Sequence, residues 1–422
     1  MTISLLLALA SAGAALPPPQ QPPVQYRVKA GETLLSIADR WFVTKASWPT
    51  VQRLNKLGDP RRIPIGKMLL IPRDFLKAVP IGAKVFAFRG DVSIDGKMPV
   101  LDTAVREGST IVTGADASVT VECSDGSRFS LPSQTRVAVA RLRRILLTGD
   151  LDRVFATSRG RGEWQVSPAP TAGSRFMVTT PVSVSAVRGT GFRVGYEGAA
   201  AVGVVNGTVG VSGGDPERAT PIPKGKGVAV AKSGVGKPVD LLPAPELLQP
   251  GATQAASDLF FAIAPVAGAK SYVVEVGTDA GLTDRVRELR GATVSARLPG
   301  LPDGSYFVRT TATDRQGIDG FAKIWAFERL TVVTPDPERE ERGTRFRWSG
   351  GEGKREYRFT LYADEAATRP LIDRTGMLEQ MITVTDLKPA TYWWRVSVTK
   401  FGGAQPIVAT GELQSFTIVA GD

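Results

Sequence analysis

Histidine is absent from this 422-residue sequence, and cysteine occurs once, as Cys123. Without histidine, the chain can form neither a Ser-His-Asp or Cys-His catalytic arrangement nor a His-ligated zinc site. With one cysteine, it can form no internal disulfide. Cys123 ends an alternating run in which Val119 and Val121 share its strand face, so we expect a buried, inert thiol rather than a nucleophile. Because no pair of carboxylates stands out either, we expect no enzymatic activity, no metal and no cofactor.

Long uncharged apolar runs are also missing. Beyond residue 25, no stretch reaches the length that crosses a bilayer without a charge. The apolar residues 1–16 end in small residues and are typical of a secretory signal peptide, although the first basic residue is Arg27. The proline-rich residues 17–25 predict a stiff linker. We therefore expect an exported protein of the periplasm or cell wall, with no transmembrane segment.

The net charge of +11 is unevenly distributed. Residues 26–75 hold 10 basic and 4 acidic side chains, a net of +6, and residues 76–213 hold 16 and 11, a net of +5. Residues 243–332 and 333–422 each have a net charge of −1. A basic surface suits an anionic polymer, and in an exported protein we expect peptidoglycan carboxylates or lipid headgroups rather than nucleic acid. A generic basic surface is the equal alternative.

Residues 26–75 combine patterns that favour a small βααβ module. Tyr26 and Val28 alternate as in a strand, and Gly31 predicts a turn before a helix that opens at Thr33. The apolar side of this helix would be Leu34, Ile37, Ala38 and Trp41, a second helix would contain Trp48, Val51, Leu54 and Asn55, and a last strand would be Met68–Ile71. This order resembles a LysM domain, a family that binds N-acetylglucosamine-containing glycans such as peptidoglycan.

The resemblance also implies a binding site. In LysM domains two turns lie side by side, and here they correspond to residues 30–33 and 62–65. A glycan presents amide and hydroxyl groups, so its binding needs exposed backbone donors and acceptors with a few apolar contacts. The glycan-binding residues that the resemblance assigns are Gly31, Glu32, Thr33, Leu34, Ile63 and Ile65. The alternative is that Gly31 and Thr33 only shape a turn and a helix cap.

Residues 79–213 are rich in strand-like alternation and lack helical periodicity. Turn signals occur at Asp125-Gly126 and at Asn206-Gly207, where the sequence predicts a hairpin. Arginines are frequent between these turns, and we expect them on solvated strand edges, where their charge would protect the sheet, with contact to a polyanion as the alternative. They are Arg141, Arg143, Arg144, Arg153, Arg159 and Arg161.

Several segments of this region resemble a FecR domain. They are residues 108–114, residues 125–127 followed by Leu131, the segment Arg188–Val194 with its Gly189-Thr190-Gly191-Phe192 motif, and residues 204–209. The resemblance implies an all-β domain of stacked short strands. The best-known members of that family span the inner membrane and regulate a sigma factor, and the sequence shows no such span, so the signalling role does not carry over.

The remaining residues divide into a linker and a repeat. Residues 214–242 are rich in Gly, Pro and Lys and predict a linker. Tyr272–Val276 then parallels Tyr357–Leu361, and Leu301–Arg309 parallels Leu387–Arg395, a period of about 85 residues. We expect two β-sandwiches, at 243–332 and 333–422, that resemble fibronectin type III domains. Tyr306, Trp348 and Tyr392 would be core aromatics, and a carbohydrate platform at Trp393 or Trp394 is the alternative.

The sequence thus predicts a mainly β, multidomain protein with a LysM module, a FecR-like domain of stacked strands and two β-sandwiches. It would bind peptidoglycan without cutting it, and its other domains would act as spacers or dock an envelope protein partner. The alternative function is envelope signal sensing, related to that of FecR regulators of sigma factors.

Overall fold

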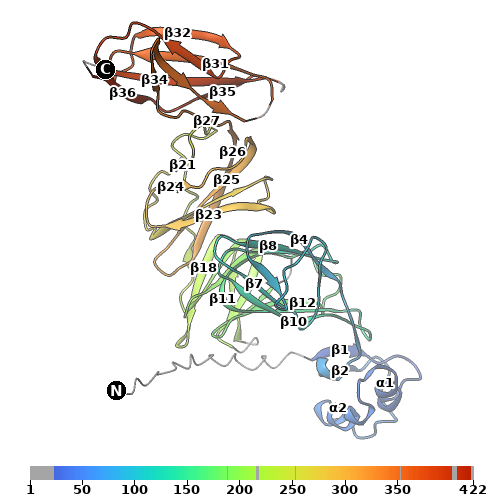
Figure 1. Ribbon diagram of the computed structural model, residues 1–422. Helices are drawn as coiled ribbons and strands as arrows, with labels where there is room; N and C mark the ends of the chain where they lie inside the picture. The colour runs from blue at the N-terminus through green and yellow to red at the C-terminus, as the bar shows by residue number, and fades with distance from the viewer. Residues whose placement is uncertain are drawn as a thin grey trace, which may run out of the picture. The chain divides into compact units, whose positions relative to one another are not determined.

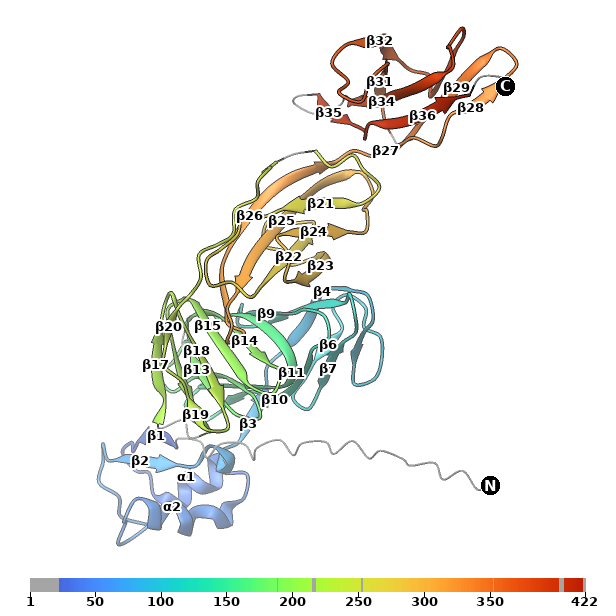
Figure 2. The ribbon, with the colours of Figure 1, turned by 90° about the vertical axis from the view of Figure 1, so that its left-hand side faces the viewer.

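A computed structural model describes residues 23–187, 189–214, 218–251, 253–351, 353–401 and 406–419 (Figures 1 and 2). The predicted signal peptide, most of the predicted linker 17–25 and Arg188 lie outside the described residues. The chain forms two compact units. The first holds the described residues up to Leu242 together with Thr313–Phe321, and the second holds Pro243–Ala312 and the described residues from Ala322 onward. Strands dominate both units, which confirms the predicted mainly β, multidomain fold.

The N-terminal module has the predicted βααβ order. Its elements are β1 (Val24–Arg27), α1 (Leu34–Trp41), the 3-10 turn η1 (Lys45–Ser47), α2 (Trp48–Leu54) and β2 (Met68–Ile71), and the 3-10 turn η2 (Arg73–Phe75) follows. β1 and β2 pair antiparallel, and both helices cover the same face of this small sheet (Figures 1 and 2). Leu34, Ile37 and Ala38 are buried under α1 as the helical spacing predicted.

The first strand begins earlier than predicted. Val24 pairs with Ile71 and is only 2% exposed, so the end of the predicted linker 17–25 belongs to the strand. Alternate side chains of a strand point to opposite faces, and Val24, Tyr26 and Val28 all enter the module's core. In α2, Val51 is buried, but Leu54 is 45% exposed because it lies at the helix end and turns away from the sheet.

The next eighteen strands belong to one continuous sheet. They are β3 (Ala78–Pro80), β4 (Ala83–Arg89), β5 (Val92–Ile94), β6 (Ala104–Val105), β7 (Thr110–Thr113), β8 (Ser118–Cys123), β9 (Arg128–Leu131), β10 (Arg136–Ile145), β11 (Leu151–Gln165), β12 (Arg175–Thr179), β13 (Val184–Val187), β14 (Gly191–Tyr196), β15 (Ala200–Asn206), β16 (Thr208–Ser212), β17 (Thr220–Pro223), β18 (Lys226–Ala231), β19 (Gly234–Val235) and β20 (Val239–Asp240). This arrangement is the predicted domain of stacked short strands.

The long strand β11 organises this sheet. Its first part pairs with β10 and β12, and its last part pairs with β9 and β14. Side chains from both parts meet in one hydrophobic core, with the fully buried Trp164 among its aromatic members. The Trp164 ring lies 4.7 Å from that of Phe129 and 5.1 Å from that of Phe155, centroid to centroid. Cys123 is buried in the same core, as its alternation with Val119 and Val121 predicted.

The prediction that residues 214–242 form a linker is wrong for most of that stretch. β17, β18, β19 and β20 continue the sheet, and β18 pairs with β15. Ile222, Val228 and Val230 are 0% exposed. Several of the Pro, Gly and Lys residues that suggested a linker lie within β17 and β18 themselves, and the few apolar residues among them alternate and fill the core.

Asn206-Gly207 is a turn but does not make the predicted hairpin. β15 pairs with β14 and β18, whereas β16 pairs with β13 and β17. Gly207 has φ +78°, a left-handed conformation that glycine adopts without strain. The turn therefore connects a strand that pairs with β14 and β18 to a strand that pairs with β13 and β17. A two-residue turn signal in the sequence cannot distinguish this connection from a hairpin.

The C-terminal strands form the two predicted β-sandwiches. The first contains β21 (Leu259–Ala262), β22 (Ser271–Gly277), β23 (Arg285–Gly291), β24 (Ser295–Leu298), β25 (Gly304–Thr313) and β26 (Asp319–Arg329). The second contains β27 (Val332–Val333), β28 (Glu338–Glu340), β29 (Gly343–Arg347), β30 (Ser349–Gly350), β31 (Arg355–Tyr362), β32 (Pro370–Met377), β33 (Met381–Val384), β34 (Ala390–Lys400), β35 (Ile407–Thr410) and β36 (Gln414–Ile418).

The repeat is visible at two tyrosines in equivalent strands. The hydroxyl of Tyr306 donates to the carbonyl of Pro302, and that of Tyr392 donates to the carbonyl of Lys388, each at 3.0 Å. Tyr392 is buried as predicted, whereas Tyr306 is only half-buried. Trp394 is 0% exposed in the second sandwich, so it cannot serve as a carbohydrate platform.

Candidate functional site

The two predicted turns of the N-terminal module lie side by side. We call residues 29–33 the first loop and residues 59–67 the second loop. The backbone N–H of Leu34 donates to the carbonyl of Pro60 at 2.8 Å, and that of Gly66 donates to the carbonyl of Val28 at 2.8 Å. These bonds join the start of α1 and the end of β1 to the second loop. The loops therefore present their exposed peptide groups on one shared surface.

Thr33 connects the first loop to α1. Its hydroxyl accepts a hydrogen bond from the Ser36 N–H at 3.0 Å, while the Ser36 hydroxyl accepts from the Thr33 N–H at 2.9 Å. This reciprocal capping box satisfies helix donors that would otherwise lack partners. Gly31 has φ +80°, and a β-carbon built on it would meet nothing within 4 Å. Gly31 and Thr33 thus shape the loop, and the backbone around Gly31 is open to a ligand.

Glu32 is held by its own module. Its carboxylate accepts from the Tyr26 hydroxyl at 2.8 Å and from the Lys29 N–H at 2.8 Å. Burial of Tyr26, together with this hydrogen bond to Glu32, raises the pKa of Tyr26 to about 12. Glu32 therefore ties the first loop to β1, so any contact with a ligand would come second to this structural role.

The other three predicted glycan-binding residues differ in exposure. Leu34 is 0% and Ile63 is 8% exposed, so both belong to the core. Ile65 is 72% exposed in the second loop and is the one large apolar side chain among the six that a sugar ring can reach. The predicted set is therefore divided between a surface formed by Gly31, Thr33 and Ile65 and a supporting layer beneath it.

Asn55 is a supporting residue whose role the sequence did not reveal. Its amide donates to the carbonyls of Val51 and Leu70, and its side-chain oxygen accepts from the Leu70 N–H at 2.7 Å. The side chain therefore joins the end of α2 to β2. An asparagine at the end of an apolar helix is the available signal, but it does not indicate which strand the amide would contact.

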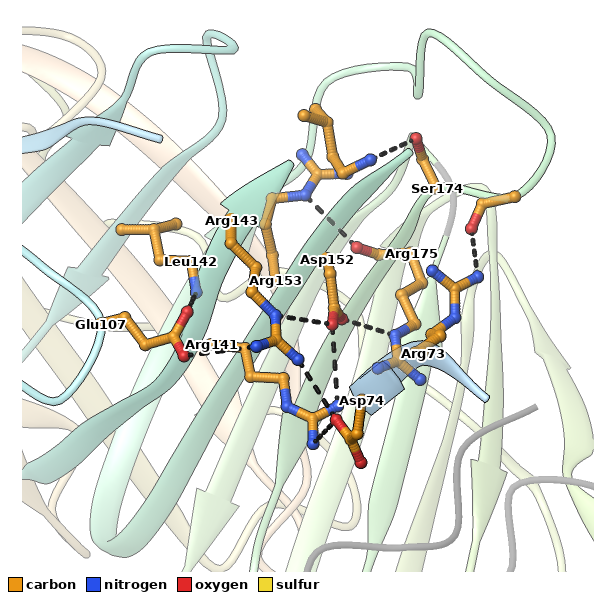
Figure 3. Close-up of polar contacts among 12 residues, drawn as sticks. Arg73, Asp74, Glu107, Arg141, Leu142, Arg143, Asp152, Arg153, Ser174 and Arg175 are labelled. Atoms are coloured by element: carbon orange, nitrogen blue, oxygen red, sulfur yellow. Dashed lines mark hydrogen bonds and ion pairs between the residues drawn. The ribbon is translucent and has the colours of Figure 1, made fainter. Parts of the chain in front are cut away.

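A buried ionic cluster joins η2 to the large sheet (Figure 3). Asp152 in β11 is 0% exposed and accepts from Nε of Arg175 at 2.6 Å, and Nε of Arg143 lies 3.4 Å from it. Asp74 in η2 is paired with Arg141 at 2.9 Å and with Arg143 at 3.2 Å. Two acidic residues from different parts of the chain thus share the same arginines.

Burial and the neighbouring arginine charges have opposite effects on the pKa of Asp152. Burial by itself would raise the pKa of this carboxyl, but the hydrogen bond from Arg175 and the charges of Arg175 and Arg141 outweigh it. The pKa of Asp152 therefore lies below its usual range. A second contact supports the same junction, because Nη2 of Arg73 donates to the carbonyl of Gly173 at 2.6 Å.

The expectation of solvated strand edges is wrong for Arg153, Arg141 and Arg143, whereas Arg144 and Arg159 are exposed. Arg153 is 1% exposed, pairs with Asp125 and stacks over the ring of Phe176. Arg141 and Arg143 are 15% and 23% exposed at their side chains. Their acidic partners come from η2, β11 and a turn far apart in the sequence, so the pattern of basic residues by itself could not reveal the pairing.

The described residues also bear on catalysis and membrane insertion. No helix among them is long and apolar enough to cross a bilayer. In the same part of the chain, no group of three or more Cys, Asp or Glu side chains is arranged to hold a metal ion. Burial raises the pKa of the Cys123 thiol to about 12, so the reactive thiolate is disfavoured at neutral pH.

Comparisons with known structures give weak overall similarity. A candidate anti-sigma factor from Parabacteroides distasonis is 22% identical over 31% of this chain, with a TM-score of 0.25. The chain spans 57% of that protein's length. The FN1–FN3 domains of chicken CNTN1 are 13% identical, with 56% of this chain and 95% of that one covered and a TM-score of 0.22. The fibronectin(III)-like modules of Clostridium thermocellum CbhA are 12% identical, with 39% and 92% covered and a TM-score of 0.18.

Comparisons with families are more specific. No curated protein matches the sequence at a significant level. Residues 26–72 match the LysM domain family, and residues 109–210 match the FecR protein family. The predicted resemblance of these two segments to LysM and FecR domains is therefore confirmed.

Proposed function

We propose that this chain is a non-catalytic protein of the cell envelope that binds the N-acetylglucosamine-containing glycan of peptidoglycan through residues 26–72. The observation that carries the proposal is the pair of backbone-linked loops in a segment that matches the LysM family. The large sheet and the two sandwiches would act as spacers or dock an envelope protein.

The shape of the surface suits an uncharged sugar backbone. Sugar amides and hydroxyls pair well with exposed peptide groups, and the backbone around Gly31 is open because no side chain covers it. Ile65 adds an exposed apolar side chain that can pack on a sugar ring. Since Leu34 and Ile63 fill the core directly beneath, this surface is held in place before a ligand arrives.

Ile65 provides the sharpest test. We expect Ile65→Asp to weaken binding to purified sacculi and to chitohexaose at least about tenfold, because the change removes an apolar contact and adds a charge that must be desolvated. The matched control is Val43→Asp, since Val43 is 67% exposed in the same module but follows α1. Co-sedimentation and calorimetric titration of the full chain measure both variants. Equal binding by Ile65→Asp and the unchanged chain would refute the proposed site.

Signal sensing in the envelope is the second candidate function. It is favoured by the FecR match and by the contacts of Arg73 and Asp74 with the sheet. Hydrogen exchange of the full chain with and without chitohexaose separates the two functions. We expect slower exchange to be confined to residues 26–72, as a simple tether requires. Slower exchange in β10–β12 as well would favour sensing.

A further inference from the structure

Basic side chains surround the two loops of the N-terminal module. They are Arg27, Lys29, Arg61, Arg62 and Lys67. Arg27 and Lys29 are exposed on and after β1, Arg61 and Arg62 are exposed in the second loop, and Lys67 is half-buried. The backbone N–H of Val28 donates to the carbonyl of Lys67 at 3.0 Å, which brings Lys67 next to the chain neighbours Arg27 and Lys29. The bond from the Leu34 N–H to the Pro60 carbonyl at 2.8 Å brings the backbone next to Arg61 to the start of α1. We call these five residues the basic rim.

Among the described residues, some charged groups of the module form ion pairs, whereas the rim residues do not. In the described part of the chain, no ion pair joins any rim residue to an acidic side chain. Elsewhere in the module, Lys45 pairs with Asp39 at 2.8 Å, and Asp74 pairs with Arg141. The rim residues thus remain available for an anionic ligand.

The acidic residues near the rim are already engaged. Glu32 accepts from the Tyr26 hydroxyl and the Lys29 N–H, and Asp59 accepts from the Arg61 N–H at 2.8 Å. Five basic residues against these two acidic ones leave a local net charge of +3. Neutral sugar hydroxyls do not require such an excess, whereas a carboxylate both neutralises it and accepts charge-assisted hydrogen bonds from it.

We propose that the basic rim binds the carboxylates that flank the glycan, so that the preferred ligand is a carboxylate-bearing glycopeptide rather than a neutral sugar chain. This inference rests on the proposed function. Peptidoglycan carries carboxylates on its stem peptides, next to the sugars that the loops would hold. Arg61 and Arg62 suit them because a guanidinium donates two parallel hydrogen bonds to one carboxylate. Lys29 adds a point charge on the first loop, and Lys67 adds one at the end of the second loop.

Neutralising the two arginines tests the rim. We expect Arg61→Gln/Arg62→Gln to weaken binding of the full chain to purified sacculi at least about tenfold at low salt, because two basic residues near an anionic surface together contribute about 2 kcal/mol, and about 1.4 kcal/mol is a factor of ten. The difference should shrink at about 0.5 M salt, where charges are screened within a few ångströms. The matched control is Arg40→Gln/Arg53→Gln, which removes the same charge from the last turns of α1 and α2. A control loss equal to that of the rim variant would overturn the proposal.

Neutral ligands separate this proposal from the proposed function. Chitohexaose should bind the unchanged chain and the rim variant equally, and sacculi with carboxylates converted into amides should bind the unchanged chain about tenfold more weakly.

If chitohexaose binds but amidation and the rim variant leave sacculus binding unchanged, the carboxylate inference fails and the glycan function stands. If the rim variant loses chitohexaose as well, the inference also fails, because the arginines then serve the sugar or the fold. If the unchanged chain binds neither ligand, the proposed function fails.

Discussion

Replacing Asp152 with Asn should lower the free energy of unfolding of the first unit by about 3–5 kcal/mol, the range measured when one partner of a buried ion pair is removed. Asp152 is 0% exposed and is the shared ion-pair partner of Arg175, Arg141 and Arg143. Asn preserves the volume but leaves these guanidinium groups without the charge that offsets their burial. Thermal or urea unfolding of the full chain measures the loss.

The control for this variant is Asp240→Asn. Asp240 also pairs with a basic residue, Lys226, at 2.7 Å, but its side chain is 83% exposed. Exposed pairs contribute little, so we expect a change below about 0.5 kcal/mol. If Asp152→Asn were as mild as Asp240→Asn, burial would not be what makes the cluster important.

The same cluster predicts an acid dependence. The folded-state pKa of Asp152 is lowered, whereas an unfolded aspartate has a pKa of about 3.9. The ionised carboxylate therefore contributes stability above about pH 4 and loses that contribution as the pH falls through the folded-state pKa. Between about pH 5 and pH 3, the unchanged chain should lose more stability than Asp152→Asn. Parallel pH profiles would contradict this account.

Replacing Trp394 with Ala should destabilise the second sandwich by about 3–5 kcal/mol, as truncation of large buried aromatics does. Trp394 is 0% exposed, and its ring centroid lies 4.9 Å from that of Phe346 and 6.0 Å from that of Phe359. Removing the indole leaves a cavity that these rings cannot fill without shifting backbone. Calorimetry of the full chain measures the change in the melting temperature of the second unit.

Trp393 supplies the matched control. It precedes Trp394 in β34 but points to the opposite face of the strand and is half-buried. We expect Trp393→Ala to cost about 1 kcal/mol, within the ordinary range for partly exposed positions. Because Asp152 and Trp394 belong to different compact units, their variants should shift different transitions. A single transition moved by both would show that the units unfold together.

Much of the N-terminal module could be predicted because its signals are local. A helix cap needs only residues three apart, and Thr33 with Ser36 forms one. Helical spacing correctly indicated that Leu34, Ile37 and Ala38 are buried, although Trp41 is only half-buried, and strand alternation correctly placed Tyr26 with Val28. The predicted ends of elements were less accurate, as Leu54 at the end of α2 and Val24 at the start of β1 show. Packing against the rest of the module decides whether the last turn of a helix or the first residue of a strand is covered.

Strand pairing and the burial of individual site residues could not be predicted from the sequence pattern. Asn206-Gly207 signals a turn, but whether its flanking strands pair with each other depends on which strands lie beside them. Residues 214–242 have the composition of a linker, yet their sparse valines complete a sheet because β15 offers an unpaired edge. The six predicted glycan-binding residues were likewise assigned as one group, although Leu34 and Ile63 lie beneath the surface that Ile65 faces.

By itself, the sequence determined the order of the modules, their mainly β character and their match to LysM and FecR families, since these depend on residues close together in the chain. Only the tertiary structure decided which charges are compensated. Glu32 became a support for its loop because the Tyr26 hydroxyl reaches it. Asp152 became the centre of a buried cluster because folding brings arginines from β10 and β12 to it. Among the residues that the structure describes, those of the basic rim form no ion pair with an acidic side chain. Coulomb energies depend on distance and burial, and neither quantity is encoded by spacing along the chain.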